Sequence, residues 1–287
     1  YIADFFAHQI SGGAELVDDY IINQLKESYD VESINSQSVA AKNIEDNKDS
    51  FFIVSNFIGL SECVKLGVSN HHYAIIEHDH KFLKTRDPSP FMNGIAPANQ
   101  IENGYFYRNA KTVFCQSKSH AECTRDNLIL DNVWSNKSLE TIESLLSNKK
   151  SIPNAVLKST NPIKGTASAV NYCKKNNIDY KLIQSPKYSE FMSQLSTVEN
   201  LTFFPQVRES FCRLVVEARM LGCSLTTNNN LGCASEEWFS SLKGRELIDF
   251  ARQRIRENIK HIENVIDGNK SEILIEPRKY PKISIIT

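Results

Sequence analysis

Short apolar runs alternate with longer segments whose apolar residues recur at helical spacing along most of the chain. Val17, Tyr20, Ile21 and Leu25, for example, share one face of a predicted helix that follows the first apolar run. This alternation is typical of parallel sheets covered by helices on both faces. Strands are expected at 1–7, 31–34, 51–55, 73–77 and 112–116, and then at 155–158, 180–183, 201–204 and 224–227.

A polar stretch at 131–151 separates the two series of strands, because it contains one predicted helix at 139–146 and no apolar run typical of a core strand. A chain of 287 residues also exceeds what one hydrophobic core usually supports. We therefore predict an α/β protein with two Rossmann-like domains at 1–130 and 131–266, followed by a linker at 267–287.

A long amphipathic helix is predicted at 242–266, since its apolar residues form a single stripe. Such a stripe has to pack against other elements, and we expect it to brace the two domains together. The stripe consists of Leu247, Ile248, Ala251, Ile255, Ile259, Ile262 and Ile266.

The composition excludes several classes of protein. Lys and Arg total 33 against 34 Asp and Glu, so the net charge of −1 gives no overall field to attract nucleic acid, and we predict no nucleic-acid partner. The 7 cysteines are odd in number and lack the short paired spacings of zinc or redox motifs, which favours a reducing, cytoplasmic location. The apolar runs are far shorter than the roughly 20 residues that span a bilayer.

The segment before and within the predicted helix 211–221 carries the clearest candidate chemistry. Ser210 is placed to cap this helix at its N-terminus, and Gly222 is placed to end it. The backbone N–H groups of Phe211 and Cys212 would then lie at the carboxyl edge of a parallel sheet. An anion such as a diphosphate binds well at that place.

Two carboxylates flank this predicted anion site. Glu209 precedes the N–H groups, and Glu217 lies two turns further along the helix, where it could accept hydrogen bonds from the hydroxyls of a ligand. A structural alternative is equally consistent with the spacing, because each glutamate is four residues from Arg213 and could pair with it.

Glu209 and Glu217, followed by Ala218 and Gly222, resemble the E-x7-E donor motif of retaining family-4 glycosyltransferases. The segment 115–122 also resembles the end of the N-terminal domain of these enzymes. The resemblance implies the GT-B fold, in which two Rossmann-like domains face each other across a cleft. It further implies transfer of a sugar from a nucleotide sugar to a glycan or other hydroxyl acceptor, with retention and without a metal or another cofactor.

Within this resemblance, the N-terminal domain is the acceptor side and the C-terminal domain holds the donor. Gly12 and Gly13 are similar to the family's GGAE loop, where glycines let the backbone approach the donor diphosphate or the acceptor. The segment 161–165 is similar to the family's K-G element, whose lysine, here Lys164, contacts the donor phosphates.

One position departs from the family pattern. The family usually has an arginine about five residues before the lysine, but residue 159 is Ser in this chain. Either Lys158 or Arg208 would have to supply the second cation, or the donor site is weakened. Lysine is the looser phosphate partner, because it lacks the bidentate geometry of arginine.

The segment 76–82 ends a predicted strand with His78, Asp79 and His80. The resemblance suggests that one of the two histidines contacts the sugar or the acceptor, and a metal site or a plain polar loop remain the alternatives. With Glu209 on the sugar hydroxyls, His78, His80 and Glu209 are the predicted catalytic residues. The predicted donor-binding residues are Gly12, Gly13, Lys158, Lys164, Arg208, Phe211, Cys212 and Glu217.

The last seven residues, 281–287, resemble the opening strand of a family-2 glycosyltransferase of the GT-A type. We therefore expect both ends of the chain to be cut from something longer, with a fused GT-A domain as partner. A lipid-linked acceptor would add membrane association. Two other functions stay open, a GT-B-shaped sugar-nucleotide epimerase and a non-catalytic glycan-binding or docking module.

Overall fold

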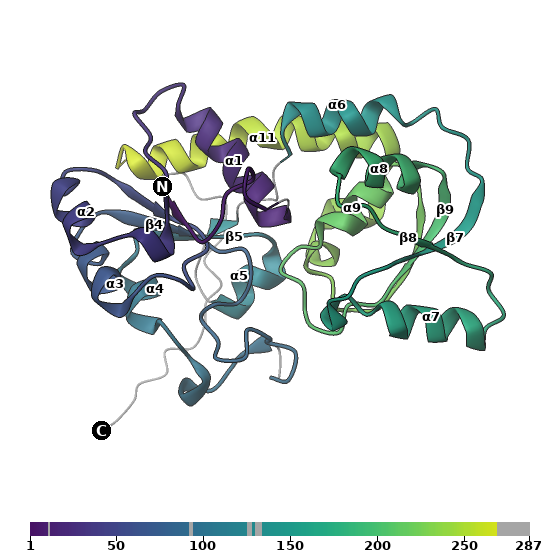
Figure 1. The fold of residues 1–287 in the computed structure, drawn as a ribbon, viewed down its shortest axis with the longest axis horizontal. Helices are drawn as coiled ribbons and strands as arrows, with labels where there is room; N and C mark the ends of the chain where they lie inside the picture. Colours follow the sequence, from purple (N-terminus) through teal and green to yellow (C-terminus); the bar gives the residue numbers. More distant parts are fainter. Residues whose placement is uncertain (11, 92–93, 125–127, 130–133, 269–287) are drawn as a thin grey trace.

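The computed structural model describes residues 1–10, 12–91, 94–124, 128–129 and 134–268. Two parallel sheets lie side by side, each with its own helices (Figure 1). The predicted α/β class is confirmed.

The first sheet has the order β2-β1-β3-β4-β5-β6, and all of its strand pairs are parallel. All residues of β3 and β4 are buried, as expected of parallel strands with helices on both faces. The expected strand at 1–7 is much shorter, and β6 was not expected. The strands are β1 (Ile2–Ala3), β2 (Ile34–Asn35), β3 (Phe52–Val54), β4 (Tyr73–Ile76), β5 (Thr112–Cys115) and β6 (Leu128–Ile129).

The second sheet has the order β10-β9-β7-β8 and is also parallel throughout. Its central strands β7 and β9 run in register, with Ala155 beside Leu201 and Val156 beside Thr202. All four strands fall where the apolar runs predict them. They are β7 (Ile152–Leu157), β8 (Lys181–Ile183), β9 (Val198–Phe203) and β10 (Ser224–Thr227).

Alternate residues of the first sheet serve two separate cores, because successive side chains of a strand point to opposite faces. Ile53 and Ile76 pack in the cluster that includes Val17 of α1, whereas Phe52 and Ile75 pack in the cluster of α2, α3 and α4. The described helices are α1 (Gly13–Leu25), α2 (Ala41–Asp46), α3 (Glu62–Val68), α4 (Gly104–Asn109), α5 (Lys118–Thr124), α6 (Asn136–Ser144), α7 (Thr166–Lys175), α8 (Tyr188–Ser196), α9 (Arg213–Met220), α10 (Glu237–Ser241) and α11 (Gly244–Ile266).

Helix α11 spans both halves of the molecule (Figure 1). It contacts α1 beside the first sheet, and α9 and α6 beside the second sheet. Six of its seven predicted stripe residues are buried, and Ile266 is partly buried. One hydrophobic cluster therefore includes residues of both sheets together with α11.

The division proposed between residues 130 and 131 lies outside the described residues, and so do residues 269–287 of the C-terminal segment. None of the helices in the described part of the chain combines the length and the apolar character needed to cross a membrane.

Shortening Ile255 tests the brace formed by α11. Ile255 is 4% exposed within the shared cluster, so Ile255→Ala should lower the free energy of unfolding by about 2–5 kcal/mol. Urea denaturation would measure this loss. Gln253→Ala, at an exposed position of the same helix, is the control and should change stability by less than about 0.5 kcal/mol. Equal effects of the two substitutions would show that α11 does not brace the fold.

Candidate functional site

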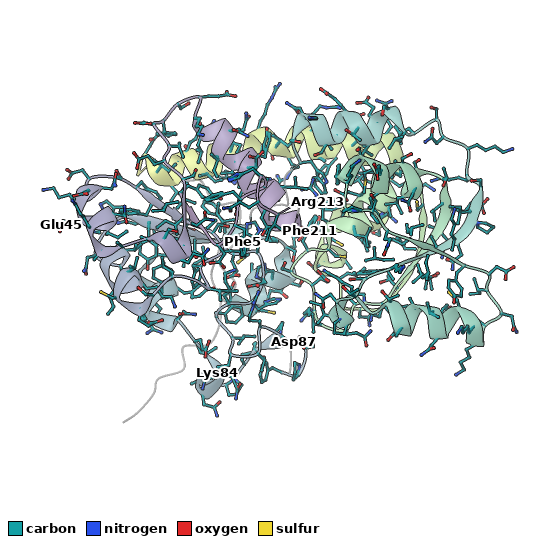
Figure 2. The ribbon with its side chains drawn as sticks, viewed as in Figure 1. Phe5, Glu45, Lys84, Asp87, Phe211 and Arg213 are labelled. Carbon is teal, nitrogen blue, oxygen red and sulfur yellow. The ribbon has the colours of Figure 1, made fainter. Side chains whose placement is uncertain are left out.

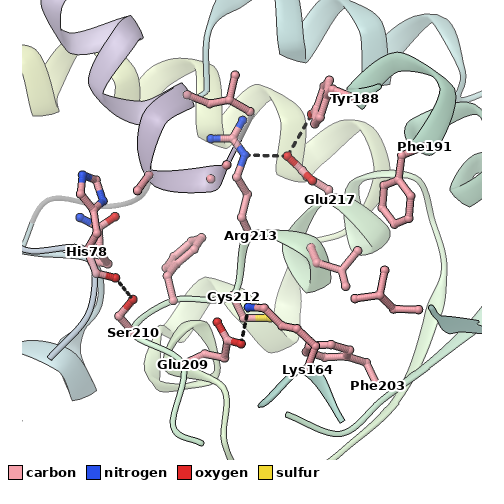
Figure 3. Close-up of a pocket in the computed structure, with 18 of the residues that line it drawn as sticks. His78, Lys164, Tyr188, Phe191, Phe203, Glu209, Ser210, Cys212, Arg213 and Glu217 are labelled. Atoms are coloured by element: carbon pink, nitrogen blue, oxygen red, sulfur yellow. Dashed lines mark hydrogen bonds and ion pairs between the residues drawn. The ribbon is translucent and has the colours of Figure 1, made fainter. Parts of the chain in front are cut away.

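A cavity of about 360 Å³ lies between the two halves of the described structure (Figure 3). Its walls include segments that follow β1, β4, β5, β7 and β9, and these segments meet because parallel strands end at one edge of each sheet. The lining residues are Gly12, Gly13, Ala14, Leu16, His78, Gln116, Leu157, Lys164, Tyr188, Phe191, Met192, Phe203, Glu209, Ser210, Phe211, Cys212, Arg213, Leu214 and Glu217.

Most of the predicted site residues are brought together in this cavity. Three of them are not among its lining residues, namely His80, Lys158 and Arg208. The eight that line it are Gly12, Gly13, His78, Lys164, Glu209, Phe211, Cys212 and Glu217.

The start of α9 differs from the prediction. The helix begins at Arg213, and Cys212 precedes it in a left-handed conformation with φ 79°. The Oγ of Ser210 donates to the backbone oxygen of His78 at 2.5 Å and so ties the two domains together (Figure 3). The prediction that Ser210 caps the helix is therefore wrong, and the N-terminal turn of α9 starts two residues later than expected.

The end of α9 agrees with the prediction. Gly222 has φ +80°, a conformation that glycine adopts without strain. Its N–H donates to the oxygen of Arg219, and the N–H of Cys223 donates to that of Ala218. These two bonds satisfy carbonyl groups of the last helical turn.

Two ion pairs involve the glutamates of the motif. The Nζ of Lys164 lies 2.7 Å from Oε1 of Glu209, and the Nε of Arg213 lies 2.7 Å from Oε1 of Glu217 (Figure 3). The structural alternative, in which both glutamates pair with Arg213, is therefore correct for Glu217 and wrong for Glu209.

Lys164 is positioned by the glycine that follows it. Gly165 has φ +66°, and a Cβ at this position would lie 1.7 Å from the backbone oxygen of Phe204. Glycine therefore permits the close turn that directs Lys164 into the cavity. Burial acts to lower the pKa of Lys164, but the charge of Glu209 outweighs this and raises it, so the ammonium keeps its proton.

Glu217 is held by three donors, one from its own helix and two from other segments of the chain. Its Oε1 accepts from Arg213, from Nε1 of Trp134 at 3.0 Å and from Oη of Tyr188 at 2.9 Å. Burial and then the charge of Glu217 raise the pKa of Tyr188, so the phenol remains a donor. The carboxylate is buried, and these bonds hold it at the wall of the cavity.

Arg213 is the functional candidate that sequence reasoning missed. Its guanidinium carbon lies 4.8 Å from the centre of the Trp134 ring. Its Cδ lies close to Gly13, because a Cβ added to that glycine would be 3.8 Å from it. Figure 2 places Arg213 between the two domains. The signal in the sequence was its position at the start of the helix. The four-residue spacing from each glutamate predicts only an ion-pair partner at this position.

Neither cation proposed in place of the family arginine lines the cavity. Lys158 is exposed at the end of β7. The backbone N–H of Arg208 donates to Oγ of Ser89 at 3.1 Å, which places this residue against the loop that contains Asp87. Arg213, in contrast, lines the cavity.

The two predicted histidines are separated. His78 lines the cavity, and its Nε2 lies 2.8 Å from Oδ1 of Asp18. His80 is 2% exposed, and its ring packs edge to face with that of His120 at 4.7 Å between ring centres. His80 is thus part of the buried interior and not of the cavity wall.

The metal alternative for this loop has no support in the described residues, which contain no group of three or more His, Cys, Asp or Glu side chains arranged to hold a metal ion. Asp79 pairs with Lys81 at 3.1 Å and also with Arg86. Burial alone would raise the pKa of Asp79, but these two cations hold it well below its usual value.

No protein-family model and no curated protein matches this sequence. Solved structures do match its fold. HepE of Anabaena, in complex with UDP and glucose, has a TM-score of 0.51 at 13% identity, with 90% of this chain and 96% of that chain covered. An alpha-glucosyltransferase in complex with UDP-glucose and DNA has a TM-score of 0.51 at 10% identity, covering 93% and 98%.

AviGT4, a glycosyltransferase involved in avilamycin A biosynthesis, gives a TM-score of 0.50 at 11% identity, with 88% of this chain and 89% of that chain covered. The chain has the GT-B fold. The cavity therefore lies in the interdomain cleft of a GT-B protein.

The buried position of His80 predicts a pH-dependent stability. Burial lowers the pKa of His80 to about 4 from 6.5, so the unfolded chain binds a proton there more readily than the folded chain. Stability is then lost as the pH falls from about 6.5 towards 4. Between pH 7 and pH 5 this loss amounts to about 2 kcal/mol.

Denaturant unfolding at both pH values would measure this dependence in the wild type and in His80→Gln, whose loss should be about 2 kcal/mol smaller. His72→Gln removes an exposed histidine and should show the wild-type dependence. An unchanged dependence in His80→Gln would contradict the prediction.

Proposed function

We propose that this protein is a glycosyltransferase that transfers a sugar from a nucleotide sugar to a hydroxyl of a glycan or lipid-linked acceptor. The observation that carries the proposal is that two ion pairs, Lys164 with Glu209 and Arg213 with Glu217, lie in the cleft of a GT-B fold. The similar structures of HepE and the alpha-glucosyltransferase contain UDP or UDP-glucose, which supports a uridine nucleotide as the ligand.

In this proposal, the donor diphosphate binds between Lys164 and the first turn of α9. Helix N-termini stabilise anions, and the adjacent ammonium adds a full positive charge. Arg213 supplies the second cation that Lys158 and Arg208 are not placed to supply. Its planar guanidinium can bind phosphate oxygens in a bidentate manner, unlike lysine.

The two glutamates recognise hydroxyl groups. Glu217 accepts hydrogen bonds from the ribose, and Glu209 accepts them from the donor sugar. Both carboxylates are already held by cations, so they are positioned before the ligand arrives. Gly12 and Gly13 let the first domain approach the diphosphate closely, and His78 lies near the reacting carbon.

In the reaction, the bond between the anomeric carbon and the diphosphate oxygen breaks, and its electron pair leaves with the diphosphate. A new bond forms between that carbon and the acceptor oxygen. The acceptor proton passes to the departing phosphate oxygen, which would place the acceptor on the same face and retain the configuration. Lys164, Arg213 and the start of α9 stabilise the charge that develops on the diphosphate.

The donor site can be tested by replacing its cations. Lys164→Ala should weaken UDP binding by about 1.5–3 kcal/mol, because a charge-assisted hydrogen bond is lost. Arg213→Ala should weaken UDP binding to a similar extent. Isothermal titration calorimetry with UDP would measure both. Lys158→Ala removes an exposed lysine from the same βα turn and should leave the affinity within about twofold of wild type.

The same titrations with UDP-glucose separate the two glutamates. Glu217→Ala should weaken both ligands, whereas Glu209→Ala should weaken UDP-glucose and leave UDP nearly unchanged. Wild-type protein that binds neither UDP nor UDP-glucose would contradict the proposed function for this donor class, and a non-catalytic module would then fit better. Release of an epimerised free sugar would instead identify an epimerase.

We also propose that catalysis needs no metal ion, because Lys164 and Arg213 can neutralise the negative charge of the diphosphate, which a metal would otherwise do. Donor binding and UDP release should therefore persist in excess EDTA. As the matched control, the same assays are repeated after manganese or magnesium has been added to the EDTA-treated protein. Activity that disappears with EDTA and returns with either ion would contradict metal independence and leave the remaining proposal intact.

A further inference from the structure

Asp18 is a carboxylate in the second turn of α1, with a relative exposure of 0%. It does not line the cavity. Burial of an ionised carboxylate is costly unless donors replace the lost water. The buried carboxylate of Asp18 therefore depends on hydrogen-bond donors from neighbouring residues.

Three donors from three separate segments of the chain meet this carboxylate. The Oη of Tyr1 lies 2.7 Å from Oδ1, and the Oγ of Ser55 lies 2.6 Å from Oδ2. The third is Nε2 of His78, 2.8 Å from Oδ1. Tyr1 precedes β1, whereas Ser55 and His78 follow β3 and β4, so the carboxylate connects residues next to three adjacent strands of the first sheet.

The hydrogen bonds define which nitrogen of His78 carries a proton. An ionised carboxylate can accept hydrogen bonds but cannot donate one. Both hydroxyls donate to Asp18, and burial raises the pKa of Tyr1 so that its phenol keeps its proton. The Nε2 of His78 is therefore the donor of the third bond. In the neutral ring, Nδ1 is left with a lone pair.

His78 also contributes to the wall of the cavity from the opposite domain to Lys164 (Figure 3). Its backbone oxygen accepts from Ser210, which fastens the histidine to the loop that precedes α9. Its Nδ1 has no hydrogen-bond partner among the described residues. The Nδ1 of His78 is therefore an available hydrogen-bond acceptor on a residue that lines the cleft.

We infer that Asp18 is a positioning residue, which orients His78 and holds it in the Nε2–H tautomer so that Nδ1 accepts a hydrogen bond from a hydroxyl of the sugar substrate. This inference rests on the proposed function for the identity of the ligand, and on geometry alone for the tautomer. Replacing Asp18 should thus affect turnover through His78, without touching the cations that bind the diphosphate.

The tautomer can be measured without any substrate. In a ¹⁵N NMR spectrum of the imidazole nitrogens at pH 8, assigned with a His78→Gln variant, His78 of the wild type should show a protonated Nε2 and an unprotonated Nδ1. Asp18→Asn places an amide donor against the ring and should increase the Nδ1–H form. A wild-type His78 that is protonated at Nδ1 would overturn the inference, even if Asp18→Asn fails to fold.

Turnover gives the second measurement, with UDP-glucose as donor and water as acceptor, followed as UDP release. Asp18→Asn should lower kcat by about 10- to 100-fold and leave the affinity for UDP within about twofold. Asp19→Asn is the matched control, because it makes the same change at the neighbouring exposed residue of α1 and should leave kcat unchanged.

The outcomes separate the inference from the proposed function. Equal loss of UDP affinity and of kcat in Asp18→Asn would indicate a merely structural role and overturn the inference. Wild-type protein that neither binds nor hydrolyses UDP-glucose would refute the proposed donor and the contact with a sugar hydroxyl. The NMR spectrum would still decide whether Asp18 holds the tautomer of His78.

Discussion

Buried carboxylates that need donors from distant segments are the constraint on which the cleft depends. Glu217 is satisfied by Trp134, Tyr188 and Arg213, and Asp18 is satisfied by residues that flank or follow three strands. Removal of one partner from such a group is costly, because it leaves an uncompensated buried charge. Each of the two networks therefore fixes side chains within its own half of the cleft.

These pairs affect what the cleft can bind. A lysine ammonium has three N–H donors and a guanidinium has five, so a single bond to a glutamate does not exhaust either group. An anion can therefore bind to Lys164 or Arg213 while each cation stays close to its glutamate. The carboxylates also oppose the binding of a bare anion by charge repulsion. A ligand that presents hydroxyls beside a diphosphate matches both kinds of group, which is the chemistry of a nucleotide sugar.

The fold was more predictable than the site because apolar periodicity reports burial directly. The strands of the second sheet and the stripe of α11 lie where the pattern places them. The roles of His78 and His80 could not be separated in this way. Both follow β4, whose regular alternation ends at Ile76, so position along the strand no longer predicts the direction of a side chain. Packing against His120 buries His80, and that contact joins residues 40 positions apart.

Arg213 shows why spacing alone could not assign the ion pairs. It is four residues from each glutamate, but four-residue spacing brings side chains together only where both residues belong to one helix. Helix α9 begins at Arg213, so Glu217 lies within the helix, whereas Glu209 lies before the left-handed Cys212. The backbone thus turns Glu209 away from the helix and towards Lys164, 45 residues earlier in the chain. The two glutamates are thereby divided between two cations, each from a different βα turn, and both cations line the cavity.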